Sequence, residues 1–152
     1  MQAEITVRRV RAEEWERLRA IRLRALADAP MAFGSTLAGE QAQPDEFWRG
    51  RAAGGAADDD RATFIAECDG EWVGLGTCVL EAGGAGERPA WVFGMWVDPV
   101  VRRQGTAQAL LRAQKRAAYS IISHPRRQRT APRTSGEHSY TAGRDRVSQF
   151  VA

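Results

Sequence analysis

The sequence feature that most constrains the fold is a short apolar segment followed closely by a basic turn and an amphipathic segment. Residues 90–97 are apolar and end at Asp98-Pro99, which favours a central β-strand. From Ala107 to Ile122, apolar residues recur at helical spacing, which predicts a helix that packs back on a sheet. These segments together predict a domain of mixed helices and strands.

The turn between the two segments has the properties of an anion site. Arg102 and Arg103 bring positive charge, Gly105 lets the backbone approach a ligand, and Ala107 is small enough to do the same. The first turn of a helix has N–H groups without partners and a positive dipole end. This combination suits a phosphate or a diphosphate, whereas the alternative is an ordinary turn with exposed arginines. The loop motifs of nucleoside triphosphate and dinucleotide sites are absent from the sequence.

The preceding part of the chain predicts a strand, two helices and a hairpin. The strand covers residues 5–10, the helices cover 13–27 and 44–53, with Gly54-Gly55 ending the second, and the hairpin joins strands 63–68 and 71–79 through Asp69-Gly70. Arg22 falls within the apolar stripe of the first helix. We favour a side chain that extends out to water, and the alternative is a cation held at the edge of a cleft.

Composition limits the class of protein. A chain of 152 residues can bury a core, and its two cysteines, Cys68 and Cys78, form neither a disulfide framework nor a zinc site. In the predicted hairpin they lie too far apart to pair, so we expect both to be reduced. No apolar run is long enough to span a bilayer and no signal peptide is recognisable, so we expect a cytoplasmic protein without a metal.

The segment Arg102-Arg103-Gln104-Gly105-Thr106-Ala107 resembles motif A of the GNAT acetyltransferases, Gln/Arg-x-x-Gly-x-Gly/Ala. The preceding Met95 to Pro99 resembles the hydrophobic strand of that family, which ends in Val-x-Pro. Ile21 to Thr36 is similar to the first-helix region of one bacterial branch. The order of elements agrees over residues 4–118. The resemblance implies a GNAT-like fold, in which helices flank a mixed central sheet.

The resemblance also implies a chemistry and its residues. Acetyl-coenzyme A would be the cosubstrate, and a primary amine of a small molecule or a protein would be the acceptor. The amides of Gln104, Gly105, Thr106 and Ala107 would hold the diphosphate, with Arg102 and Arg103 nearby. The backbones of Trp96 and Val97 would pair with the pantetheine arm, and the Val97 amide would polarise the thioester carbonyl. The acetyl group would pass directly to the amine.

Two parts of the chain depart from the family pattern. Several members carry a glutamate where this chain has Ala90-Trp91-Val92, so we name no general base, although Glu87 or a bound water are alternatives. After Ile122 the apolar pattern stops. We therefore predict a GNAT-like domain over residues 1–122 and a basic, disordered tail over 123–152. Tyr119 and Tyr140 do not match the family's tyrosine motif.

The tail has two explanations, a shifted reading frame or a natural variant with a shorter sheet. Without a fifth strand the sheet would have a bare edge, through which copies of the chain could associate. An alternative function is therefore a catalytically impaired relative that binds coenzyme A or acts as an interaction module. Residues 1–111 carry 13 arginines and 17 acids, whereas residues 112–152 carry nine Lys or Arg and two acids. Nucleic-acid binding by this basic end is a weaker alternative than a solvated tail.

Overall fold

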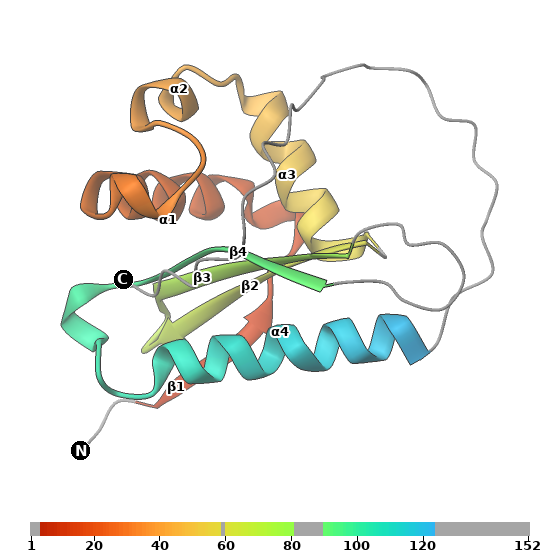
Figure 1. The fold of residues 1–152 in the computed structure, drawn as a ribbon. Helices are drawn as coiled ribbons and strands as arrows, with labels where there is room; N and C mark the ends of the chain where they lie inside the picture. The colour runs from red at the N-terminus through yellow and green to blue at the C-terminus, as the bar shows by residue number, and fades with distance from the viewer. Residues whose placement is uncertain (1–3, 59, 81–89, 124–152) are drawn as a thin grey trace, which may run out of the picture.

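A computed structural model describes residues 4–58, 60–80 and 90–123 of the chain. Figure 1 shows one sheet with helices on both of its faces. The strands are β1 (Ile5–Arg9), β2 (Arg61–Cys68), β3 (Glu71–Leu80) and β4 (Ala90–Val97). The helices are α1 (Trp15–Asp28), α2 (Leu37–Gln41), α3 (Asp45–Ala57) and α4 (Thr106–Ser123), and short 3-10 turns cover Ala12–Glu14, Pro30–Ala32 and Pro99–Val101. This architecture confirms the predicted fold class.

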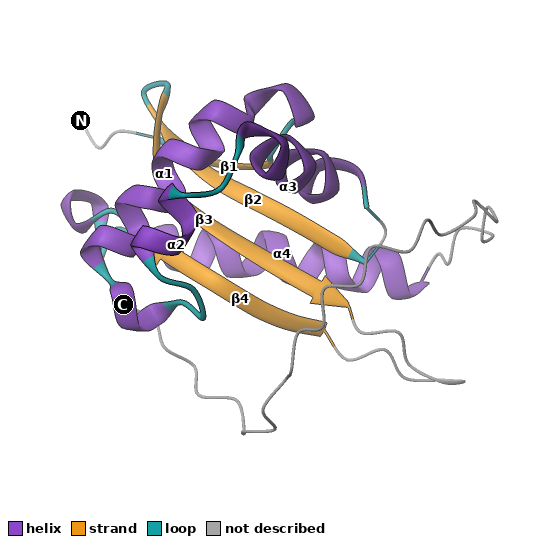
Figure 2. Ribbon diagram, turned by 90° about the horizontal axis from the view of Figure 1, so that it is seen from above, coloured by secondary structure: helices purple, strands orange, loops and turns teal. Residues whose placement is uncertain are grey.

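The four strands lie in the order β1-β2-β3-β4, and each neighbouring pair is antiparallel. Helices α1 and α3 cover one face of the sheet and α4 covers the other, as Figures 1 and 2 show. Successive residues of a strand point to opposite faces. In β2, Ile65 therefore packs with residues of α1 and α3, whereas Phe64 and Ala66 pack with Leu110 of α4. None of the helices in the described segments is long and apolar enough to cross a membrane.

The hairpin of β2 and β3 forms as predicted. Asp69 has φ +50° and Gly70 has φ +81°, the pair of positive angles that a type I′ turn requires. Cys68 pairs with Glu71 beside this turn, whereas Cys78 pairs with Ala62 at the other end of the hairpin. Both cysteines are free thiols, which confirms the prediction that they do not form a disulfide.

Two sequence predictions about elements are wrong. The sequence predicts segment 90–97 in the centre of the sheet, but β4 is its outer strand among the strands that the structure describes. Helix α3 does not stop at Gly54-Gly55 and continues to Ala57. Because Gly55 is buried against β2, the absent side chain lets the helix pass close to the sheet. The predicted tail, apart from Ser123, and Glu87 lie outside the described residues.

Gly55 and Gly50 in α3 make a matched pair for testing this packing. A Cβ on Gly55 would lie 2.7 Å from Thr63 Oγ1, whereas a Cβ on Gly50 would meet no atom within 4 Å. We expect Gly55→Ala to lower the free energy of unfolding by about 1–3 kcal/mol because it overpacks the core. Gly50→Ala should raise it by about 0.5–1 kcal/mol through helix propensity. Urea denaturation measures both, and equal stabilities would contradict the described contact between α3 and β2.

Candidate functional site

The turn that joins β4 to α4 is held open by its backbone conformation. Asp98 accepts a hydrogen bond from the Val100 N–H at 3.1 Å, which starts the 3-10 turn after the strand. Arg103 and Gly105 then adopt positive φ angles of +63° and +80°. The Thr106 hydroxyl donates to the Val101 carbonyl at 3.3 Å and fixes the start of α4. These contacts place a left-handed turn directly before the N-terminus of an 18-residue helix.

The amide groups at this helix start are available to a ligand. The first backbone hydrogen bond of α4 joins the Ala109 N–H to the Gly105 carbonyl at 2.9 Å. The N–H groups of Thr106, Ala107 and Gln108 precede it and have no helical partner. A Cβ on Gly105 would meet no atom within 4 Å, so the space above the turn is open. Free N–H groups and the positive end of the helix dipole are together a chemical environment that favours an anion.

A hollow of about 450 Å³ lies over the turn. It is lined by Glu4, Ile5, Arg103, Gln104, Gly105, Thr106 and Ala109. Arg103 is exposed there, and Glu4 is the only acidic residue in this lining. The structure thus brings Arg103, Gln104, Gly105 and Thr106 of the predicted site together around one open space.

The register of β4 decides where the Val97 amide points. Val97 lies opposite Gly74 of β3, and the Asp98 N–H donates to the Val73 carbonyl at 2.8 Å. In an antiparallel pair the backbone groups of successive residues alternate in direction. The N–H and C=O of Val97 are therefore turned away from β3, toward the outer side of β4. The same alternation turns the backbone of Trp96 toward β3, so we expect a ligand at this edge to pair with Val97 and not with Trp96.

Arg102 lies in a different environment from Arg103. Its Nε donates to the Val97 carbonyl at 3.0 Å, and its Nη2 lies 2.6 Å from Asp28 Oδ2. Trp96 Nε1 donates to the same Asp28 oxygen at 2.9 Å. The Trp96 hydrogen bond, followed by Arg102, holds the pKa of the Asp28 carboxyl below its usual range. Sequence reasoning missed Asp28, since it lies in α1, far along the chain from both of its partners.

The similarity to known proteins agrees with this geometry. The profile of the Acetyltransferase (GNAT) family matches residues 15–121, which is more than half of the chain. The chain belongs to the GNAT acetyltransferase family. No curated protein sequence matches it.

Several solved structures share the fold of this GNAT protein. The aminoglycoside N-acetyltransferase AAC(6')-Iy in complex with CoA has a TM-score of 0.59 at 19% identity, covering 79% of this chain and 72% of that one. A predicted acetyltransferase with acetyl-CoA from Clostridium acetobutylicum has a TM-score of 0.60 at 17% identity, covering 80% and 77%. The ribosomal-protein-alanine N-acetyltransferase from Brucella melitensis has a TM-score of 0.58 at 20% identity, covering 78% of this chain and 74% of that one. At these identities the likeness shows the shared fold.

Arg22 of this GNAT protein is buried, so the prediction that its side chain extends to water is wrong. Its guanidinium donates to both carboxyl oxygens of Glu40 at 2.9–3.2 Å and to the Ser35 hydroxyl at 3.1 Å. It stacks 4.2 Å from the Phe33 ring centroid and approaches β4 so closely that a Cβ on Gly94 would lie 2.8 Å from Nη1. Arg22 therefore ties α1 and α2 to the middle of β4.

Glu40 is the partner that makes this burial possible. Burial alone would raise the pKa of the Glu40 carboxyl, but hydrogen bonds from Arg22 and Ser35 and the charge of Arg51 hold that pKa below its usual value. Neither Glu40 nor its helix α2 was predicted from the sequence. The available signal was Thr36, whose hydroxyl caps α2 by accepting the Gly39 N–H at 3.1 Å.

Three acidic residues that the structure describes near β4 already have partners. Asp28 pairs with Arg102, Asp98 with Arg24, and Glu40 with Arg22. Within residues 90–123 there is no other candidate base, because Asp98 is the only acid there. Tyr119 is 71% exposed on α4, while Tyr140 lies outside the described residues. The described part of the structure therefore adds no general base or acid to the site.

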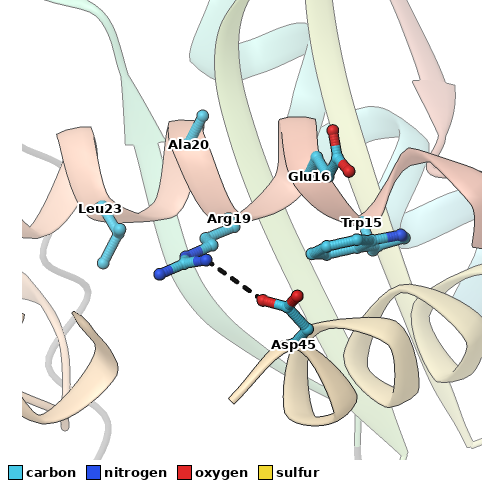
Figure 3. A pocket seen from close by; sticks show the side chains of 6 residues that line it. All are labelled: Trp15, Glu16, Arg19, Ala20, Leu23 and Asp45. Atoms are coloured by element: carbon cyan, nitrogen blue, oxygen red, sulfur yellow. Dashed lines mark hydrogen bonds and ion pairs between the residues drawn. The ribbon is translucent and has the colours of Figure 1, made fainter. Parts of the chain in front are cut away.

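A second hollow of about 490 Å³ lies between α1 and the start of α3, and Figure 3 shows the side chains that line it. Arg19 of α1 and Asp45 of α3 form an ion pair across it at 3.4 Å. The guanidinium of Arg49 lies 4.3 Å from the centroid of the Trp15 ring, so this aromatic face already has a partner. None of the predicted site residues contributes to this hollow.

Proposed function

We propose that this protein transfers the acetyl group of acetyl-coenzyme A to a primary amine of a small molecule or a protein. The observation that carries the proposal is the open turn at residues 103–107, which joins β4 to α4. It offers free amides, a positive helix end and an exposed arginine to an anion. GNAT structures with the same fold hold CoA or acetyl-CoA, which supports this choice of ligand.

The turn before α4 and the backbone of Val97 would have different roles in binding and catalysis. The amides of Gln104, Gly105, Thr106 and Ala107 bind the diphosphate, and Arg103 adds charge. The pantetheine arm pairs with the outer backbone edge of β4 at Val97. The Val97 N–H stabilises the oxygen that becomes negative as the amine nitrogen attacks the thioester carbon. The C–S bond then breaks, and the acetyl group stays on the amine as the thiolate leaves. Because the carboxylates described beside β4 are paired, water is the acceptor that we propose for the proton of the amine.

Calorimetric titration with acetyl-coenzyme A tests the binding step, and a thiol-release assay with a panel of amines tests the transfer. We expect one acetyl-coenzyme A per chain and amine-dependent release of free thiol. A chain that binds no acetyl-coenzyme A would contradict the proposal at its root. Binding without amine-dependent thiol release would support acetyl-coenzyme A as the ligand but contradict the proposed transferase activity.

A second candidate function is a coenzyme A-binding or interaction module without catalysis. Two observations favour it: the carboxylates described beside β4 are paired, and β4 exposes Val92 by 43% and Phe93 by 53%. An outer strand with exposed apolar residues can pair with another chain, including a second copy. Sedimentation velocity over a concentration series distinguishes a monomer from such an oligomer, and the thiol-release assay decides whether either species is an enzyme.

A further inference from the structure

Three distant parts of the chain meet at one oxygen atom. Asp28 is the last residue of α1, Trp96 lies near the end of β4, and Arg102 begins the turn that leads to α4. Trp96 Nε1 and Arg102 Nη2 both donate to Asp28 Oδ2, at 2.9 and 2.6 Å. The carboxylate therefore joins the layer of α1 to the strand and the turn that form the candidate site.

The Asp28 carboxylate does not stabilise its own helix, α1. A carboxylate in the last turn of a helix meets the negative end of the helix dipole, which is locally unfavourable. Both hydrogen bonds that it accepts come from outside α1. The Trp96 side chain is only 2% exposed and also lies 5.4 Å from the Arg24 guanidinium, so one of these two partners is fixed by packing.

Arg102 carries this connection to the backbone of β4. While its Nη2 contacts Asp28, its Nε donates to the Val97 carbonyl at 3.0 Å. The N–H and the C=O of a strand residue point to the same side. A guanidinium held on the Val97 carbonyl therefore also fixes the direction of the Val97 amide. Because the main chain of Arg102 opens the turn, the same contact sets where the turn begins.

We infer that Asp28 is a positioning residue of the acyl-coenzyme A site, an inference that rests on the proposed function. Through Arg102 it fixes the Val97 amide relative to the amides of Gln104 to Ala107. The ligand must engage both sets at once, one with its thioester and the other with its diphosphate. Asp28 touches neither of them, and it acts only by keeping these two sets of donors in register.

The test is a double-mutant cycle of Asp28→Asn and Arg102→Gln, with acetyl-coenzyme A affinity measured by calorimetry. The asparagine side chain can still accept the Trp96 hydrogen bond, so this variant removes the charge and little else. We expect Asp28→Asn to weaken binding about five- to tenfold at an unchanged stoichiometry of one per chain. Arg102→Gln should weaken binding by a similar factor. The double variant should bind acetyl-coenzyme A as weakly as Arg102→Gln alone. The matched control is Asp45→Asn, which removes an aspartate–arginine pair remote from the turn and should bind like the wild type.

Each other outcome overturns the inference. Unchanged or tighter binding by Asp28→Asn would mean that Asp28 does not position the donors. It would also mean that Arg102 without its Asp28 partner contributes at least as much to ligand binding. A fall in stoichiometry at unchanged affinity would indicate a purely structural role. The same loss in the Arg102→Gln background would show that Arg102 does not transmit the effect. If the wild-type chain binds no acetyl-coenzyme A, the proposed function fails as well, whereas the other outcomes reject the role of Asp28 alone.

Discussion

Replacing Gly105 by valine is expected to weaken acetyl-coenzyme A binding by about 100-fold or more, because two or more charge-assisted hydrogen bonds would be lost. Gly105 has φ +80°, which a β-branched residue adopts only with strain, and its Cα faces the open space over the turn. Valine would both distort the turn and fill the position that the diphosphate needs. Calorimetric titration of the folded variant measures the loss.

Gly70 provides a matched control for this substitution. It has φ +81°, and a Cβ on it would also meet no atom within 4 Å, but it lies in the hairpin turn of β2 and β3. Gly70→Val should therefore cost a similar amount of stability, about 1–2 kcal/mol, without changing the affinity for acetyl-coenzyme A. If both variants bind like the wild type, the turn before α4 is not the diphosphate site.

Replacing Arg22 by methionine is expected to lower the free energy of unfolding by about 3–5 kcal/mol, because it leaves the buried Glu40 carboxylate without its main partner. The side chains of Arg22 and Glu40 are only 8% and 6% exposed. The matched control is Arg19→Met in the same helix. Arg19 pairs at 3.4 Å with Asp45, which is 60% exposed, so its loss should cost at most about 1 kcal/mol. Urea denaturation compares the two.

The double variant Arg22→Met/Glu40→Leu should recover much of that loss, since an apolar pair can replace a buried ion pair. The pH dependence of the free energy of unfolding gives a second measurement. The lowered pKa of Glu40 means that its ionised form stabilises the folded chain above the ordinary carboxyl pKa, and that this stability is lost as pH falls through the lowered value. Equal stabilities of Arg22→Met and Arg19→Met would contradict the described burial of Arg22.

The parts of the fold that were predictable depend on local chemistry. Asp69-Gly70 specifies its turn through the conformations that these two residues tolerate, and the hairpin forms where the sequence predicts it. The segment from β4 through the turn to α4 is equally local, because each element is set by its own periodicity and its flanking residues. The helix starts at Thr106, one residue before the apolar pattern begins at Ala107.

The parts that were missed depend on contacts between distant segments. Arg102 and Arg103 are adjacent and equally basic in the sequence, yet only Arg102 meets Asp28, 74 residues earlier. Arg22 is buried because α2 brings Glu40 beside it, and α2 is only five residues long, too short for its apolar spacing to be recognised. A periodic pattern identifies which face of a helix is buried, but it does not identify the partner of a buried charge.

A crystal structure of the chain with acetyl-coenzyme A tests the central claim most directly. We predict the diphosphate within hydrogen-bonding distance of the N–H groups of Gln104 to Ala107, with the pantetheine arm along the outer edge of β4 at Val97. A diphosphate bound elsewhere on the protein, or a turn whose N–H groups close onto its own backbone, would contradict it.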